Sequence, residues 1–398
     1  MREIQKDNKF FFLFPNESTF GETKGTVFLP SSNFLTQKNI NQSAFSHFFC
    51  TFVNEMKTLL PAEWEPQWGV QLTWPHEETD WKPYLKEITD TYLEMARAIT
   101  QYEMLLAVAP DISFVRQQLI DGDVDISRVV FHQCPTNDTW ARDHGFITLE
   151  RRDERGEMVM LDFCFNGWGQ KFEAEKDNAI NRSLFPTLIS HLSSLIYESC
   201  LDFVLEGGSI ESDGKGTIFT TSSCLLAPNR NQPLTREQIE EELKKRLHAE
   251  RIMWIDHGHL TGDDTDGHID TLVRIAPNDT LLYIGCDDKG DEQYDELKAM
   301  EDQLVTFRTR QGKPYRLLRL PLPDPIYDDG ERLPATYANY LIINGAVLVP
   351  TYGQSEKDAE AIRIIQQAFP DQKMIPIDSR TIIRQHGSIH CCTMQFPL

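Results

Sequence analysis

Four short segments of the chain combine acidic side chains, histidine or cysteine with glycine, and they are the first candidates for chemistry. They run from Thr136 to Gly145, from Leu205 to Gly208, from Asp266 to Asp270 and from Gly387 to Cys392. Glycine beside a reactive side chain lets the backbone approach a ligand closely. The segments lie far apart in the sequence, so only the fold can bring them to one site.

Cys391 lies seven residues before the C-terminus, between His390 and Cys392. A cysteine in an apolar strand is more often buried and inert than nucleophilic. It attacks as the thiolate, so a nucleophilic cysteine needs a positive neighbour. A cationic guanidinium group held beside Cys391 would supply that charge, and such a substrate would help to ionise its own nucleophile.

Three acidic residues have the chemistry that a guanidinium requires. The group is planar, always charged near neutral pH, and presents its N–H donors in a fixed fork that carboxylates accept. Asp143, Glu206 and Asp270 could supply these carboxylates. Trp140 could add a π face that attracts a delocalised cation, although a tryptophan taken alone more often fills the core.

His268 and Asp270 are separated by one residue. On an extended segment both side chains point to the same face, so an imidazole and a carboxylate can address one ligand. A lone His-x-Asp pair is more often part of a surface loop. Asp263, Asp264 and Asp266 invite comparison with a calcium loop, but the spaced ligands, central glycine and final glutamate of an EF-hand are missing. We therefore expect no metal ion.

The composition of the 398 residues excludes several classes of protein. Hydrophobic residues make up 40% and charged residues 25%, which is ordinary globular usage and gives no support to disorder, collagen or coiled coil. The formal net charge of −22 repels nucleic-acid backbones and anionic membrane surfaces. We therefore expect neither nucleic acid nor membrane as a partner, although the same field would attract a small cation.

No segment is typical of a signal peptide or a membrane span. The apolar run from Phe10 to Phe14 is short and is stopped by Pro15, and no other stretch approaches the ~20 apolar residues of a spanning helix. The eight cysteines include no CxxC pair, which argues against a zinc site or a disulfide framework and fits a reducing compartment. We expect a cytoplasmic protein.

Short β-branched or aromatic runs alternate with helix-period segments, which predicts a mixed α/β fold. We expect strands at residues 103–108, 129–131, 145–149, 159–165, 203–205, 217–220, 272–275, 281–284 and 346–349. We expect helices at residues 81–100, 186–199, 235–247, 291–303 and 356–369. The helix at 235–247 begins with the capping-box spacing from Thr235 to Gln238.

Several strands end in a similar phrase, such as Leu225-Leu226-Ala227-Pro228 and Val347-Leu348-Val349-Pro350. Such echoes indicate one supersecondary unit used several times around an axis, although chance similarity is a serious alternative. No low-complexity linker divides the chain. We expect a single catalytic domain at residues 58–398. Residues 1–57, with a short strand at 26–29, are expected to be an elaboration packed on the core, and the sequence leaves their role open.

Taken together, the four segments resemble the agmatine deiminase and bacterial-type peptidylarginine deiminase family of the pentein, or guanidino-group-modifying, superfamily. The resemblance runs from about Leu60 to the end. It also includes Pro61-Ala62-Glu63-Trp64-Glu65-Pro66 and the segments 162–169, 228–231 and 337–340. It implies an α/β fold, a five-bladed propeller with pseudo-fivefold symmetry and the active site on its axis. It implies a hydrolase that needs no cofactor.

The resemblance also implies roles for individual residues. Cys391 is similar to the family's nucleophile, and His268 is similar to its general acid and base. Asp143 and Asp270 match the carboxylates that hold the guanidinium nitrogens. Glu206 matches the acid that orients the histidine and the substrate.

The residues expected to bind the substrate are Trp140, Asp143, Trp168, Asp270 and Asn339. The chain also departs from the family pattern. Where the family usually has Gly-Gly-Asn before Ile-His-Cys, this sequence has His386-Gly387-Ser388. Ser388 offers one polar group where asparagine offers two, so local contacts to the substrate are expected to differ.

The resemblance favours agmatine as the substrate, with N-carbamoylputrescine and ammonia as products, a reaction of putrescine (polyamine) biosynthesis. Relatives that act on peptidyl-arginine carry an Arg-x-Arg pair for a substrate carboxylate, where this chain has Gly167-Trp168-Gly169. A carboxylate placed there would be poorly paired. The alternatives are a peptidylarginine deiminase, an amidinotransferase and a non-catalytic guanidinium-binding protein. The sequence leaves the oligomeric state open, including a homo-oligomer.

Overall fold

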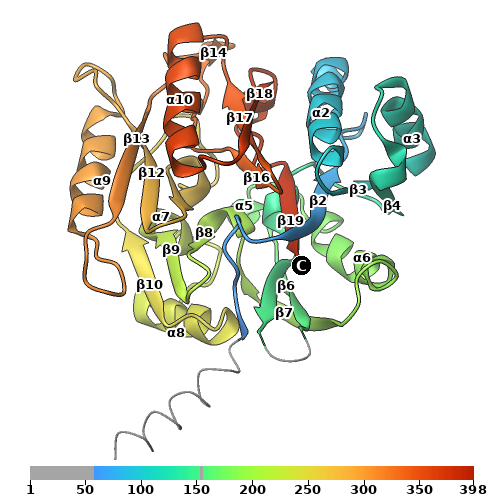
Figure 1. The fold of residues 1–398 in the computed structure, drawn as a ribbon, viewed down its shortest axis with the longest axis horizontal. Coiled ribbons are helices and arrows are strands. Elements are labelled where there is room, and N and C mark those ends of the chain that lie inside the picture. The colour runs from blue at the N-terminus through green and yellow to red at the C-terminus, as the bar shows by residue number, and fades with distance from the viewer. Residues whose placement is uncertain (1–57, 153–155) are drawn as a thin grey trace, which may run out of the picture. The chain divides into compact units, whose positions relative to one another are not determined.

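The computed structural model describes residues 58–152 and 156–398, which belong to one compact unit (Figure 1). Helices and strands alternate along these residues, so the predicted mixed α/β fold is confirmed. The expected N-terminal elaboration at residues 1–57, with its strand at 26–29, lies outside the described residues. No helix in the described ranges is both long and apolar enough to cross a membrane.

The described strands form five sheets of three or four strands and one two-stranded hairpin. One four-stranded sheet consists of β19 (Thr393–Pro397), β2 (Gln67–Thr73), β3 (Met104–Ala109) and β4 (Val129–Gln133). The other consists of β1 (Thr58–Leu59), β5 (Ile147–Arg151), β6 (Met158–Cys164) and β7 (Leu195–Val204). The three-stranded sheets are β10 (Arg251–Ile255), β9 (Thr217–Thr221) and β8 (Ile210–Ser212); β11 (Val273–Ala276), β12 (Thr280–Gly285) and β13 (Arg316–Pro321); and β16 (Leu341–Ile343), β17 (Ala346–Thr351) and β18 (Lys373–Asp378). The hairpin is β14 (Tyr327–Asp328) with β15 (Glu331–Arg332).

One arrangement recurs in the five larger sheets. An antiparallel strand pair is followed by a helix and then by a strand that pairs in parallel with the second strand. The connecting helices are α2 (Leu85–Thr100), α6 (Ile180–Ile189), α8 (Arg236–Arg246), α9 (Tyr294–Thr306) and α10 (Ser355–Ala368). In one unit the antiparallel partner of β2 is β19, so the C-terminal strand completes a unit that begins near the start of the described chain. The repeated unit expected from the strand ends is therefore present.

Of the remaining helices all but α3 (Ile112–Asp121) are single turns, and several of these turns carry the site. The single turns are α4 (Ala141–His144), α5 (Gly167–Gln170) and α7 (Ser222–Leu225), and the 3₁₀ turns η1 (Lys82–Tyr84), η2 (Ile126–Arg128), η3 (Asp177–Ala179), η4 (Gly207–Ser209), η5 (Ile269–Thr271) and η6 (Ile382–Gln385).

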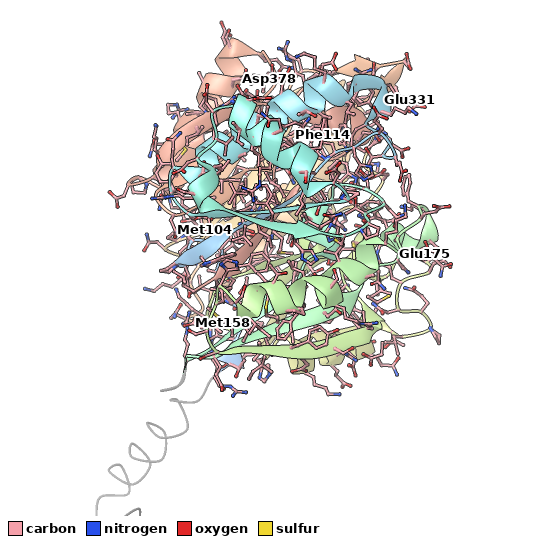
Figure 2. The ribbon with its side chains drawn as sticks, turned by 90° about the vertical axis from the view of Figure 1, so that its right-hand side faces the viewer. Met104, Phe114, Met158, Glu175, Glu331 and Asp378 are labelled. Carbon is pink, nitrogen blue, oxygen red and sulfur yellow. The ribbon has the colours of Figure 1, made fainter. Side chains whose placement is uncertain are left out.

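Strands β3 and β6 are apolar along most of their length because they are covered on both faces. Their first residues, Met104 and Met158, lie on the same side of the molecule in Figure 2. Side chains of the two strands, including Leu106 and Met160, meet in one buried apolar cluster. Helix α3 covers β3 from outside, and Phe114 on its outer face is 59% exposed (Figure 2).

The helix predicted at residues 186–199 is wrong. Helix α6 starts earlier and buries Ile180, Leu184 and Leu188 at four-residue spacing. Residues 195–204 form β7 instead, which pairs in parallel with β6. This pairing is a tertiary contact, and such contacts override local helical spacing. By contrast, the capping box predicted at the start of α8 is confirmed.

Candidate active site

Short helical turns bring the four sequence segments to one place. Asp143 lies in α4, and Glu206 immediately precedes η4. His268 immediately precedes η5, which contains Asp270, and Cys391 lies two residues before β19. The backbone N–H of Arg142 donates to the carbonyl oxygen of Cys391 at 3.1 Å, which ties α4 to the cysteine loop.

Gly208 is the point at which three of these side chains meet. A Cβ atom added at this residue would lie 2.6 Å from Nδ1 of His268, 2.9 Å from Oδ1 of Asp143 and 3.2 Å from Oδ2 of Asp270. Any other residue would displace these groups, so glycine is required here by space.

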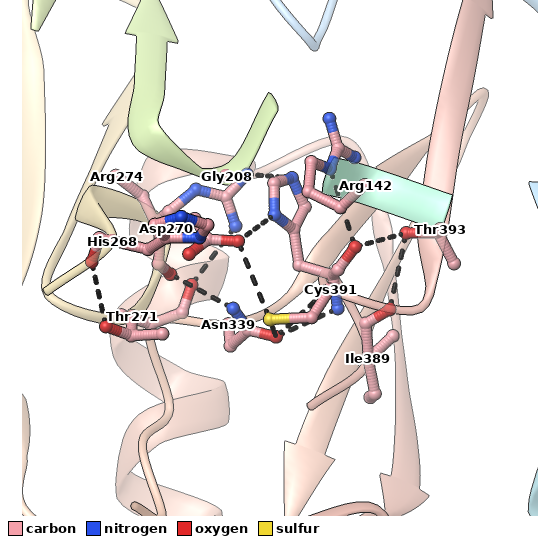
Figure 3. Close-up of polar contacts among 12 residues, drawn as sticks. Arg142, Gly208, His268, Asp270, Thr271, Arg274, Asn339, Ile389, Cys391 and Thr393 are labelled. Carbon is pink, nitrogen blue, oxygen red and sulfur yellow. Dashed lines mark hydrogen bonds and ion pairs between the residues drawn. The ribbon is translucent and has the colours of Figure 1, made fainter. Parts of the chain in front are cut away.

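The thiol of Cys391 lies between two polar groups and is 3% exposed (Figure 3). Its Sγ is 3.8 Å from Oδ2 of Asp270 and 3.4 Å from Oδ1 of Asn339. Burial raises the pKa of Cys391 well above its ordinary value, and the nearby charges of Asp270 and Asp143 raise it further. The free protein therefore holds this group as the thiol.

Asn339 clamps the cysteine loop through its amide group (Figure 3). Oδ1 accepts hydrogen bonds from the backbone N–H groups of His390 at 3.0 Å and Cys391 at 3.3 Å. Nδ2 donates to the carbonyl oxygen of Asp270 at 3.4 Å. Asn339 thus joins the cysteine loop to η5.

Asp143 accepts hydrogen bonds from Nε1 of Trp168 at 3.0 Å and from the backbone N–H of Gly208 at 3.2 Å. Its Oδ1 is 3.6 Å from Nδ1 of His268. Burial raises the pKa of Asp143 to about 6; His268 opposes this shift, while Asp270 and Glu206 add to it.

Asp270 is fully buried but is held differently. Its Oδ2 accepts a hydrogen bond from Nδ1 of His390 at 2.8 Å. Burial alone would raise the pKa of Asp270, but the hydrogen bond and charge of His390, together with His268 and Arg274, lower it below its ordinary value. Its other oxygen, Oδ1, has no hydrogen-bond partner within the described part of the chain.

His268 is also fully buried, and neither ring nitrogen has a hydrogen-bond partner among the described residues. Burial alone would lower the pKa of His268. The charge of Asp143, the neighbouring Cys224 and the charge of Glu206 outweigh burial and raise the pKa of His268 well above its ordinary value. The imidazole therefore carries a proton that it can donate.

Two clusters contain residue types that can hold a metal ion: Glu206 with Cys224 and His268, and Glu63 with Glu211 and His390. In each cluster an arginine already pairs with the carboxylates. Nε of Arg230 donates to Oε1 of Glu206 at 3.0 Å, and Nη2 of Arg274 donates to Oε2 of Glu63 at 2.6 Å. These arginines supply the positive charge that a metal would bring, so we assign both clusters as ion pairs.

Cys391 lies in the wall of a narrow cavity of about 30 Å³. The cavity is lined by Asp80, Asp138, Trp140, Asp143, Trp168, Phe172, Asp264, Thr265, Gln385, His386, Gly387 and Cys391. Of the expected site residues, Trp140, Asp143, Trp168 and Cys391 therefore face it. No lysine or arginine is among the described residues of this wall.

Several site residues were not predicted from the sequence. Arg230 holds Glu206, and Cys224 lies beside His268. Glu63, Arg274 and His390 form the ion-pair network next to Asp270. Glu63, Arg230 and His390 had one signal, their place in segments that carry the resemblance, whereas Cys224 and Arg274 had none beyond their residue type.

An acidic cavity has Cys391 and Asp143 in its wall, and Asp270, His268 and Glu206 lie beside these two residues. Such a set of groups is that of a hydrolytic enzyme that acts on the C–N bonds of guanidino groups. The chain belongs to the Porphyromonas-type peptidyl-arginine deiminase family, whose profile matches residues 59–397.

Individual relatives cover most of the chain. A candidate agmatine deiminase from Vibrio parahaemolyticus is 34% identical over 355 residues, which span 85% of this chain and 96% of that protein. The crystal structure of a candidate arginine deiminase from Porphyromonas gingivalis matches 86% of this chain and 98% of its own, at 48% identity and a TM-score of 0.79. The structure of C. jejuni agmatine deiminase with substrate bound matches 86% of this chain and 96% of its own, at 38% identity and a TM-score of 0.77.

Proposed function

We propose that the protein hydrolyses agmatine to N-carbamoylputrescine and ammonia. The observation that carries this proposal is the wall of the cavity at Cys391. Asp80, Asp138 and Asp264 add three acidic side chains to that of Asp143, and no described residue of the wall is a lysine or arginine. Agmatine is cationic at both ends and suits such a wall, whereas the carboxylate of arginine or of a peptide would lie unpaired in it.

In the proposed first half-reaction, the guanidinium lies between Asp143 and Asp270. Its positive charge offsets the carboxylates that hold the thiol protonated, so Cys391 releases its proton to solvent. The thiolate attacks the central carbon and forms the C–S bond. His268 donates its proton to the departing nitrogen, the C–N bond breaks, and ammonia leaves a covalent thiouronium.

In the second half-reaction, His268 is neutral and takes a proton from water. The water oxygen attacks the thiouronium carbon, and the C–S bond breaks to release the thiolate. The product loses its remaining proton to solvent and leaves as the ureido compound. Asp143, Asp270 and Glu206 hold the substrate and the imidazole and balance their charge throughout.

For the fold, we propose that the five repeated units are the blades of a five-bladed α/β propeller with pseudo-fivefold symmetry, formed by a single domain at residues 58–398. The number of units supports this arrangement, as does the pairing of the C-terminal β19 with β2. The site residues come from short turns at the ends of different units, as expected for a site on a common axis. We further propose that the enzyme acts in the cytoplasm.

A peptidyl-arginine deiminase is the second candidate, favoured by the family description and by the 40% identity to the crystal structure of a candidate peptidyl-arginine deiminase. Ammonia release from agmatine, arginine, dimethylarginine and a peptide with C-terminal arginine separates the candidates. We expect kcat/KM for agmatine to exceed the values for the other three substrates by about tenfold or more. A ratio of this size corresponds to the free energy lost when one charged group is left unpaired. A faster peptide reaction would identify the second candidate.

The same assay tests the two remaining alternatives. Ammonia released without an added amine acceptor excludes an amidinotransferase. Stoichiometric agmatine binding without ammonia, and without a covalent adduct on Cys391, would identify a guanidinium-binding protein and contradict the proposal.

A further inference from the structure

A buried histidine next to the cysteine joins Asp270 to the Pro61–Pro66 motif. Nδ1 of His390 is 2.8 Å from Oδ2 of Asp270, and Nε2 is 2.8 Å from Oε1 of Glu63. The imidazole is fully buried. A carboxylate oxygen can only accept, so Nδ1 of His390 carries the hydrogen that is donated to Asp270.

This hydrogen bond divides the two oxygens of Asp270 between different tasks. Oδ2 is engaged by His390 and faces the sulfur of Cys391 at 3.8 Å. Oδ1 has no partner in the part of the chain that the structure describes. A buried carboxylate oxygen without a donor is costly, and an N–H of a bound guanidinium would satisfy it.

Glu63 fixes the ring of His390 from the other side. Its Oε2 accepts from Nη2 of Arg274 at 2.6 Å, and its Oε1 accepts from Nη1 of Arg142 at 3.1 Å. Nη1 of Arg274 donates in turn to the carbonyl oxygens of Ala338 at 3.1 Å and Tyr340 at 2.5 Å. The carboxylate of Glu63 is thus anchored to several elements and has little freedom to move.

We infer that His390 and Glu63 are positioning residues of the reaction: His390 holds Oδ2 of Asp270 so that Oδ1 faces the guanidinium, and Glu63 holds the ring of His390. The inference rests on the proposed function for the identity of the bound group. Neither residue touches the reacting atoms, and both act through Asp270.

Two substitutions of His390 separate the two ring nitrogens. In His390→Asn the side-chain amide nitrogen replaces Nδ1 and can still donate to Asp270. In His390→Gln the amide lies near the place of Nε2, so the contact with Glu63 is kept and the donor to Asp270 is lost. A purely structural role would make the two variants equally poor, whereas positioning of Asp270 makes the asparagine variant the better one.

The readout compares two alkylating probes of Cys391 and does not require turnover. Chloroacetamidine is a cationic amidine that uses the guanidinium contacts, and iodoacetamide is neutral and does not. In both, the thiolate forms a C–S bond and halide leaves. The ratio of the two rate constants, measured by the mass of the Cys391 peptide, reports whether Oδ1 of Asp270 receives a cation. If agmatine is not hydrolysed, the proposed function fails while this ratio still tests the inference.

We expect His390→Gln to lower the ratio by about tenfold or more, and to raise KM for agmatine more than it lowers kcat, because one charged hydrogen bond is misdirected. His390→Asn is expected to stay within about threefold of the original protein. Equal ratios in the two variants, whether both high or both low, would overturn the inference.

Glu63→Gln provides a second test that does not depend on the folding of the His390 variants. It keeps the size of the side chain but weakens the grip on His390, so the ratio should fall by about threefold. Glu65→Gln is the matched control, because Glu65 lies in the same motif but pairs with Arg152, and it should leave the ratio unchanged. An unchanged ratio in Glu63→Gln would contradict the role of Glu63.

Discussion

Asp143 and Asp270 carry the same functional group but titrate differently because their neighbours differ. Asp270 has a histidine and an arginine nearby, and these lower its pKa against the effect of burial. Asp143 is bonded to neutral donors and repelled by two other acids, so burial raises its pKa to about 6. At the residue scale, Asp143 is therefore the carboxylate whose ionisation limits guanidinium binding in the proposed mechanism.

This difference predicts the acid limb of the pH profile. Below pH 6 Asp143 is protonated in the free enzyme and cannot pair with the guanidinium, so kcat/KM for agmatine should fall with decreasing pH from about 6. The fall should approach about tenfold per pH unit, as for one proton. Initial rates at low agmatine concentration measure the limb, and circular dichroism checks that the fold persists. A profile flat down to pH 4 in the folded enzyme would contradict the prediction.

Cys391→Ser tests the nucleophile directly. The serine hydroxyl cannot form the thiolate, so ammonia release should fall on the order of 10³-fold or more. Agmatine binding, measured by calorimetry, should persist because the carboxylates are unchanged. Cys392→Ser is the matched control, since that buried neighbour is absent from the described wall of the cavity. Normal turnover by Cys391→Ser would rule out the proposed mechanism.

The residues proposed to contact the substrate could be predicted from the sequence, whereas most of the contacts that hold them in place could not. Cys391, His268 and Asp143 stand in segments that combine glycine with polar residues, and this local composition marks a candidate site. Glu63 and His390 are 327 positions apart, and their contact depends wholly on how the repeated units pack. No local pattern encodes such a contact.

At the element scale, the α5 turn aims an indole at the site. Trp168 has a φ of 53° and a ψ of 49°, in the left-handed region that residues other than glycine rarely adopt. This conformation allows Nε1 to donate to Oδ2 of Asp143 at 3.0 Å while the ring packs edge-on against Phe165. A short, strained turn thus fixes the orientation of the Asp143 carboxylate, which is proposed to hold the substrate.

Trp168→Phe should keep the packing and remove this hydrogen bond. One oxygen of Asp143 then loses its donor, and KM for agmatine should rise by about tenfold, the value of one hydrogen bond to a charged group. kcat should change less. Trp74→Phe is the control, because it removes a similar indole hydrogen bond, to Gln118, outside the site. An equal change of KM in both variants would assign the effect to general loosening.

Strand and helix predictions succeeded where the local pattern and the tertiary contacts agree. β6, β12 and β17 have apolar runs and also lie in the middle of their sheets, paired on both sides. β7 is at an edge and is partly exposed, so its sequence carries less of the apolar signal, and its extended form depends on the pairing with β6. That dependence explains why residues 186–199 were predicted as helix.

At the scale of the whole molecule, the repeated units are joined by buried polar contacts. Oε2 of Glu103, just before β3, accepts a hydrogen bond from the backbone N–H of Asn344 at 2.7 Å, in the turn between β16 and β17. Oε1 of Glu103 has no partner among the described residues. Burial raises the pKa of Glu103 to about 7 against the hydrogen bond from Asn344, which lowers it, so the buried position favours the neutral carboxyl group.

The stability of the fold should therefore depend on pH through Glu103. In the unfolded chain the group loses its proton near its ordinary pKa of 4.5, whereas in the folded chain it does so near 7. The contribution of Glu103 to the free energy of unfolding is therefore complete below pH 4.5 and is lost as the pH rises through 7. Glu103→Gln removes the ionisation, so relative to the original protein it should gain about 2 kcal/mol of unfolding free energy between pH 5 and pH 8. Urea titrations at both pH values measure the change, and an identical difference at both would refute the assignment.

The net charge of −22 acts on the approach of a cationic substrate. Agmatine enters a wall that contains four acidic side chains, and the field of the molecule draws it toward this wall. Salt shortens the range of that field to about 3 Å at 1 M. kcat/KM for agmatine should therefore fall by about threefold or more between low salt and 0.5 M NaCl. kcat should stay nearly constant, because it describes substrate that is already bound and does not depend on the rate of approach.

The alkylation of Cys391 by neutral iodoacetamide provides the control and should not respond to salt. Equal salt dependence of the two reactions would mean that salt acts on the thiol itself, and that the acidity of the molecule does not guide its substrate.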